Sequence, residues 1–245
     1  MAFDILIPKL ETQVSIAGNI GLYSYGTAFF TFIALVILIS ISRRHNPVGN
    51  ALLTASILTA VWAAVVAIST LLASPILLLI QLTEAARNGA WIFVLLKLLS
   101  LRLQGTDQPL ATTRWVPWYF LSFTMIVVLI ISIDSLLENA PSLFNIALSA
   151  NSAGWLAMSI VSLLLLEQYY RNSNDDELWP TKHLCLGLGI LFAFDLFMYA
   201  EGLLFRQLNH NAWQARGLVS VMAAILIGIS VSRTAGKEVI GNQQA

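Results

Sequence analysis

The chain is organised as long apolar stretches separated by short polar breaks. A helix that spans the hydrocarbon core of a bilayer needs about 20 predominantly apolar residues. Seven stretches are long enough, and the breaks between them carry turn and helix-start residues such as Pro47, Pro75 and Asn209. The pattern therefore predicts an all-α integral membrane protein with seven transmembrane helices, at residues 20–42, 49–73, 75–99, 115–134, 144–166, 183–205 and 212–232.

The composition agrees with a membrane protein. Of the 245 residues, 58% are hydrophobic and 11% are charged, whereas soluble domains carry about 25% charged residues. The formal net charge is zero, so no basic surface points to nucleic acid as a partner. The single cysteine, Cys185, excludes an internal disulfide and any cysteine-rich metal site.

The distribution of positive charges predicts the orientation, because Lys and Arg are enriched on the cytoplasmic side of a membrane. One predicted side holds only Lys9, Arg206 and Arg216. We therefore expect an extracytoplasmic leader at residues 1–19, a seven-helix domain at 20–234 and a cytoplasmic tail at 235–245, in a multi-pass membrane protein. The other predicted side holds nine of the 13 basic residues: Arg43, Arg44, Lys97, Arg102, Arg114, Arg171, Lys182, Arg233 and Lys237.

Charged residues lie at membrane depth in two of the predicted helices. Arg87 is near the midpoint of 75–99, and Asp195 is near the midpoint of 183–205. A charge at the bilayer centre costs at least about 2.5–3.5 kcal/mol on insertion scales, so such residues tend to face the interior of a bundle and to pair there. The two helices therefore place opposite charges at similar depth.

The spacing within each of these helices predicts one shared polar face. Arg87 and Asn88 follow Glu84 by three and four residues, so the three side chains project from the same side of the helix. Asp195 and Tyr199 are also four apart, whereas Glu201 is rotated away and lies nearer the external face. We expect a buried polar cluster that senses a ligand or signal, with a structural ion network and a proton or ion path as alternatives. The candidate residues are Gln81, Glu84, Arg87, Asn88, Asp195, Tyr199 and Glu201.

Several chemistries are excluded by residue placement. No lysine lies at mid-membrane, so a retinal Schiff base has no attachment point and no cofactor is expected. The three histidines, His45, His183 and His210, lie near different helix ends without an HExxH pattern, and we predict no metal site. The sequence also has no GxSxG, Walker or GxGxxG motif. We expect no enzymatic activity of this chain.

Three blocks resemble the N-terminal membrane region of the PrsK-type sensor histidine kinases associated with PEP-CTERM and exosortase systems. They are "ALLTASILTAVWAAVVAI" (51–68), "LLLIQLTEAARNGAWIFVLLKLL" (77–99) and "FAFDLFMYAEGLLFRQLNHNAWQARGLVSVMAAILIGISVSRT" (192–234). In that family the seven-helix region precedes cytoplasmic GAF-like and kinase modules. This chain ends at Ala245 without a histidine-phosphorylation box or ATP-binding motifs, so the resemblance implies the sensor portion alone.

The resemblance predicts a signal-input domain that detects an external or intramembrane stimulus and passes it through the sixth and seventh helices. The implied partners are the lipid bilayer, a cytoplasmic kinase module or response-regulator pathway, a second copy in a homodimer, and a small ligand. A small transporter or channel that uses the intramembrane acids is one rival. A structural or assembly subunit is the other.

Overall fold

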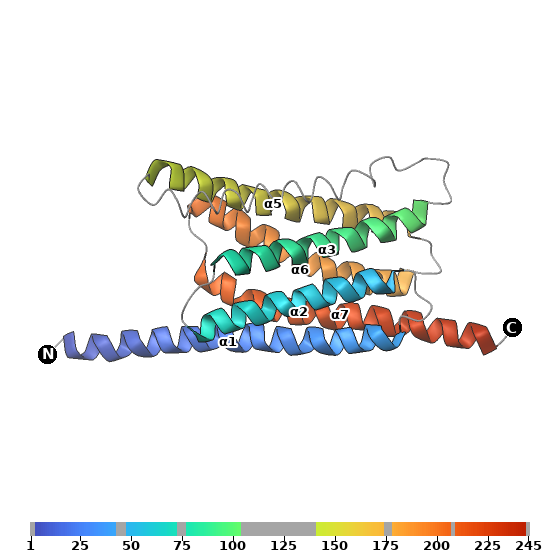
Figure 1. The fold of residues 1–245 in the computed structure, drawn as a ribbon, viewed down its shortest axis with the longest axis horizontal. Coiled ribbons are helices and arrows are strands. Elements are labelled where there is room, and N and C mark those ends of the chain that lie inside the picture. The colour runs from blue at the N-terminus through green and yellow to red at the C-terminus, as the bar shows by residue number, and fades with distance from the viewer. Residues whose placement is uncertain are drawn as a thin grey trace.

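The structure, a computed structural model, describes residues 3–42, 48–72, 77–103, 141–173, 178–206 and 209–243. All of its regular elements are helices that run side by side along the long axis of the molecule (Figure 1). The all-α prediction is confirmed for the described part of the chain. The predicted helix at 115–134 lies outside the described residues. The helices are α1 (Phe3–Ser42), α2 (Gly49–Leu71), α3 (Leu77–Leu103), α5 (Pro141–Arg171), α6 (Leu178–Phe205) and α7 (His210–Gln243).

Four of these helices contain segments long and apolar enough to span a membrane. The segments are Ile20–Ser42, Gly49–Leu71, Thr181–Phe205 and His210–Arg233, and they identify a helical membrane protein. Over its described residues α3 has no segment of this kind, because it carries polar side chains such as Glu84, Arg87 and Asn88 in its first half. The membrane span predicted for this helix therefore depends on its burial against other helices.

The helices form a closed circuit, in which each one packs against two neighbours. Helix α1 contacts α2 and α7, α7 contacts α6, α6 contacts α5, and α3 lies between α2 and α5. A side chain that points into the circuit is shielded from lipid by helices on all sides. The polar face of α3 can be buried in this arrangement.

Two described helices extend by more than ten residues beyond the predicted apolar stretches. Helix α1 begins at Phe3 rather than at residue 20, and α7 continues to Gln243 rather than ending near 232. The backbone of residues 3–19, predicted as a separate leader, is therefore helical and continuous with the first apolar stretch. These extensions project from opposite ends of the bundle (Figure 1).

Small residues allow α7 to approach its neighbours closely. A Cβ atom added at Gly217 of α7 would overlap the backbone and the hydroxyl of Ser24 on α1, and one added at Gly187 of α6 would lie 3.0 Å from the carbonyl oxygen of Ala223. At the same contact, the Ser24 hydroxyl accepts a hydrogen bond of 3.0 Å from the Leu218 N–H. Such close backbone contacts stabilise helix pairs in membranes, where burial of apolar surface supplies little driving force.

The bundle interior has an apolar part and a polar part. The apolar part is built around Trp91 of α3 and includes Leu95 from the same helix and Leu188 and Phe192 from α6. The polar part lies nearer the end of the bundle where α3, α5 and α7 begin. That polar part is the candidate functional site.

Candidate functional site

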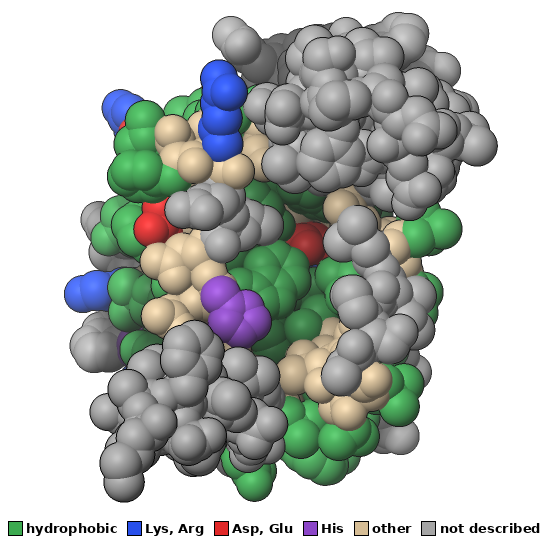
Figure 2. Space-filling view, turned by 90° about the vertical axis from the view of Figure 1, so that its left-hand side faces the viewer, with side chains coloured by type: hydrophobic (Ala, Val, Ile, Leu, Met, Phe, Trp, Pro, Cys, Tyr) green, Lys and Arg blue, Asp and Glu red, His purple; other side chains and the backbone are tan. Residues whose placement is uncertain are grey.

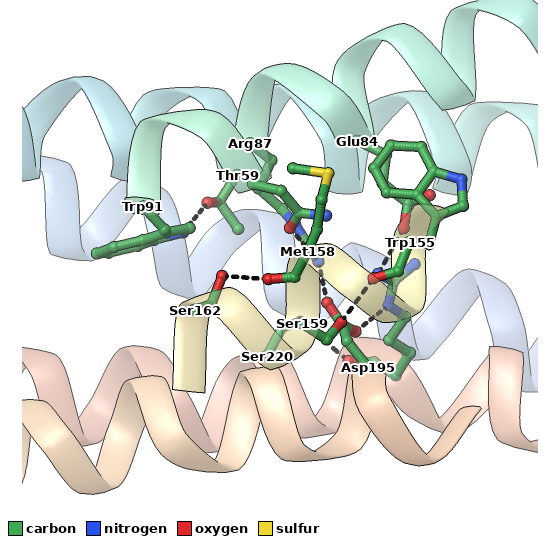
Figure 3. Close-up of polar contacts among 12 residues, drawn as sticks. Thr59, Glu84, Arg87, Trp91, Trp155, Met158, Ser159, Ser162, Asp195 and Ser220 are labelled. Atoms are coloured by element: carbon green, nitrogen blue, oxygen red, sulfur yellow. Dashed lines mark hydrogen bonds and ion pairs between the residues drawn. The ribbon is translucent and has the colours of Figure 1, made fainter. Parts of the chain in front are cut away.

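Two arginines and two acids from three helices pair in the bundle interior. Arg87 Nη2 of α3 lies 2.6 Å from Asp195 Oδ2 of α6, and Arg216 Nε of α7 lies 2.7 Å from the other carboxylate oxygen of Asp195. Arg216 Nη2 also lies 2.5 Å from Glu84 Oε1 of α3. Figure 3 shows Arg87 and Glu84 projecting from α3 toward Asp195. We call Glu84, Arg87, Asp195 and Arg216 the four-charge network.

The local sequence of α3 explains why one helix supplies both an acid and a base. Glu84 and Arg87 are three residues apart and therefore share a face. The next residue, Asn88, holds the guanidinium in place, because its side-chain oxygen accepts hydrogen bonds from Arg87 Nε (3.2 Å) and Nη2 (3.0 Å). On α6, Tyr199 follows Asp195 by four residues, and its hydroxyl donates a hydrogen bond to Glu84.

The network is buried and electrically balanced. The exposed fractions are 2% for Glu84, 0% for Arg87 and 1% each for Asp195 and Arg216. Two positive and two negative side chains sum to zero formal charge. Balance matters here, because a buried charge whose partner is removed costs about 3–5 kcal/mol, whereas complete pairing offsets most of the loss of hydration.

Aromatic rings surround the two guanidinium groups. The Cζ atoms of Arg87 and Arg216 lie 4.1 Å and 4.9 Å from the ring centroid of Trp62, which is fully buried on α2. Arg216 also lies 5.5 Å from the Tyr199 ring and 5.3 Å from the Trp213 ring. Each desolvated contact of this kind contributes up to about 2 kcal/mol. The aromatic rings therefore help both arginines to stay charged away from water.

The structure brings together most of the predicted site residues. Glu84, Arg87, Asn88, Asp195 and Tyr199 are joined by the contacts described above. Their geometry is thus the predicted one, while their role in sensing stays a prediction. Gln81 is half-buried and lies one turn before Glu84 on α3.

Glu201 lies apart from these contacts. Its Oε1 accepts a hydrogen bond of 3.1 Å from Asn209, at the junction between α6 and α7. The physical reason is the helical repeat, because six residues after Asp195 the side chain points about 120° away around the helix axis. Glu201 contacts the cap of α7, where the Asn209 side chain accepts a hydrogen bond from the Asn211 N–H at 3.0 Å.

Sequence reasoning missed Arg216 and Trp62. Arg216 was counted among the basic residues of the outer side and not among the site residues, whereas the structure buries it on α7 and pairs it with both acids. Charge balance is the signal that could have found it. Arg87 alone leaves Glu84 and Asp195 with one unpaired negative charge, and Arg216 lies within the predicted seventh helix.

The network lies close to one end of the bundle. Arg216 follows the first residue of α7 by six positions, which corresponds to about 9 Å along the helix. Figure 2 shows this end, where an acidic side chain is visible among hydrophobic ones near the centre of the described surface. Within the described ranges, no group of three His, Cys, Asp or Glu side chains could hold a metal ion.

Comparisons of the chain with protein-family models, with curated proteins and with solved structures gave no match.

Proposed function

We propose that this chain is the signal-input region of a sensor protein in the bacterial inner membrane, as its resemblance to the PrsK-type histidine kinases implies. The observation that supports this proposal is the course of α7. The helix carries Arg216 in the four-charge network and continues without interruption to Gln243. That distance is 27 residues, or about 40 Å at 1.5 Å per residue. The network and the end of the bundle from which α7 projects therefore lie on one continuous helix.

The network couples α7 to two other helices through interactions with discrete geometry. Asp195 contacts both arginines, so a shift of α6 changes the pairing of α3 and α7 together. A stimulus that stabilises one pairing over another changes the populations of two helix arrangements, and it does so only to the extent of its differential affinity. We propose that α6 and α7 transmit this difference to a cytoplasmic kinase module.

The proposed orientation keeps the amino terminus outside and the carboxyl terminus in the cytoplasm. Arg216 is buried in the bundle and is therefore left out of the count. The predicted outer side then has Lys9 and Arg206, while the predicted inner side has nine basic residues. The larger asymmetry favours the same orientation.

The test joins the full chain to a cytoplasmic kinase module after Gln243 and measures phosphotransfer to a response regulator. Arg87→Met removes one partner of Asp195, and we expect the ratio of active to inactive kinase to change by about 5- to 150-fold, the usual range of allosteric coupling. Arg171→Met is the matched control, because Arg171 is exposed and pairs with the exposed Glu167 at 3.4 Å.

Unchanged signalling by a folded Arg87→Met protein would contradict the proposal. A transporter predicts a different result, namely solute or proton flux in proteoliposomes that Glu84→Gln abolishes. An assembly subunit predicts a co-purifying protein and normal behaviour of Glu84→Gln.

A further inference from the structure

Three buried donor nitrogens beside the network have no hydrogen-bond acceptor among the described residues. They are Trp62 Nε1, Arg87 Nη1 and Arg216 Nη1, and the three residues are at most 1% exposed. Arg216 Nη2 also lacks hydrogen-bond geometry, but its ion pair with Glu84 at 2.5 Å satisfies its charge. Buried donors without an acceptor are rare and costly. Both guanidinium groups lie beside the Trp62 ring, with their Cζ atoms 4.1 Å and 4.9 Å from its centroid.

These groups are all donors, and this fact restricts what could occupy the site. The described side chain with an unpaired buried acceptor is Glu201, which lies on another face of α6. A cation would supply no acceptor to these donors and would place a further positive charge beside two guanidinium groups. The occupant must therefore supply acceptor oxygens.

The charge of the network restricts the occupant further. The four side chains already sum to zero, so an anion would add an unpaired negative charge to an interior of low dielectric constant, where such a charge is strongly disfavoured. A neutral acceptor avoids that cost. A carbonyl oxygen has two lone pairs and no proton to donate, and the apolar cluster of Trp62 with Tyr25, Val66 and Ile80 favours an apolar body for the molecule that carries it.

We propose that the site binds a neutral molecule with a carbonyl oxygen on an apolar body. The oxygen accepts one hydrogen bond from Trp62 Nε1 and one from a free Nη1 group of Arg87 or Arg216. This inference rests on the proposed function, because it names the chemical class of stimulus for the same network. Such a molecule partitions into lipid and reaches the bundle without crossing water as an ion.

Trp91 provides an internal control for the test. Like Trp62 it is 0% exposed, but its Nε1 donates a hydrogen bond of 3.0 Å to the Thr59 hydroxyl on α2. The two indoles therefore differ in whether an acceptor is already present. A ligand that supplies a carbonyl oxygen to the network should affect Trp62 and leave Trp91 unchanged.

The experiment uses the full chain in lipid nanodiscs with ¹⁵N-labelled tryptophan, so that each of the seven tryptophans contributes one indole N–H signal. Trp62→Phe and Trp91→Phe assign the two signals by their loss, with Trp62→Tyr as a second variant should the first not fold. The probes are acetophenone, benzoate and ethylbenzene. They share a similar size but carry a neutral carbonyl, a carboxylate and no acceptor, respectively.

We expect acetophenone to move the Trp62 indole signal downfield in a saturable manner while the Trp91 signal stays in place. Benzoate and ethylbenzene should leave the Trp62 signal unchanged. Three results would each overturn the inference: no response to acetophenone, which would assign water to the donors; an equal response to ethylbenzene, which would indicate general partitioning; or a larger response to benzoate, which would indicate an anion site.

This binding test and the kinase test fail independently. A Trp62 signal that ignores acetophenone refutes the ligand class, while a kinase that still responds to Arg87→Met keeps the proposed signalling role. Binding without any effect of Arg87→Met on kinase output would refute the signalling role and keep the site.

Discussion

The two parts of the bundle interior are stabilised in different ways. Around Trp91 the side chains are apolar, and the described side-chain hydrogen bond of Trp91 to Thr59 joins two neutral groups. Around Trp62 two full positive charges face two full negative ones. The stabilisation from packing declines gradually as contacts are lost. Removing one partner from a buried ion network instead leaves an uncompensated charge, which destabilises the fold strongly. We therefore expect a substitution in the polar part to lower the free energy of unfolding more than a substitution in the apolar part does.

Asp195→Asn should give the largest loss of stability. Asp195 pairs with both Arg87 and Arg216, so neutralising it leaves two buried cations with Glu84 as their one remaining acid in the network. We expect the free energy of unfolding to fall by about 3–5 kcal/mol, measured by reversible unfolding in mixed detergent micelles. Glu167→Gln is the control, because that carboxylate is 59% exposed. A loss of unfolding free energy smaller than that caused by truncating a buried apolar side chain would contradict this expectation.

Leu188→Ala tests the apolar part by truncating a side chain that is 0% exposed. Leucine truncations in soluble proteins cost about 2–5 kcal/mol, from lost transfer energy and from the cavity together. In a bilayer the transfer contribution is small, because lipid is as apolar as leucine. We therefore expect about 2 kcal/mol in the same unfolding assay. A loss equal to that of Asp195→Asn would remove the distinction between the two parts.

Thr59→Val examines the neutral hydrogen bond of the apolar part. It removes the acceptor for Trp91 Nε1 while nearly preserving the side-chain volume. A neutral hydrogen bond contributes about 1 kcal/mol, so the expected loss is about that size. Thr59→Ser retains the hydroxyl oxygen and should keep the Trp91 indole N–H signal in its original position. Equal losses for Val and Ser would show that the hydrogen bond contributes nothing.

Helices and charge pairs differed in how well the sequence could predict them. The apolar stretches predicted the described helices to within a few residues at most ends, because a membrane span needs a fixed length. The contact between Arg87 and Asp195 was predicted, because these opposite charges lie at similar depths in their helices. Trp62 could not be found in this way, because α2 carries no charged side chain that would mark its inward face. The extension of α7 past Arg233 was also missed, since hydropathy reports membrane depth and says little about helix beyond it.

The smallest predicted effect concerns salt and compares a buried ion pair with an exposed one. Arg171 and Glu167, 75% and 59% exposed, form an i,i+4 pair at 3.4 Å on the surface of α5. Exposed pairs contribute about 0–1 kcal/mol, and 1 M salt shortens the Debye length from about 10 Å to about 3 Å. The contribution of Arg171, measured as the difference between wild type and Arg171→Met, should therefore vanish in 1 M salt.

The contribution of Asp195, measured in the same way with Asp195→Asn, should persist in 1 M salt. Counter-ions cannot approach a side chain that is 1% exposed, and screening of buried pairs is much weaker than screening of surface pairs. A network that loses most of its contribution in salt would have to be open to solvent ions. That result would argue against a closed site selective for neutral molecules and would favour the ion path that the acids alone suggest.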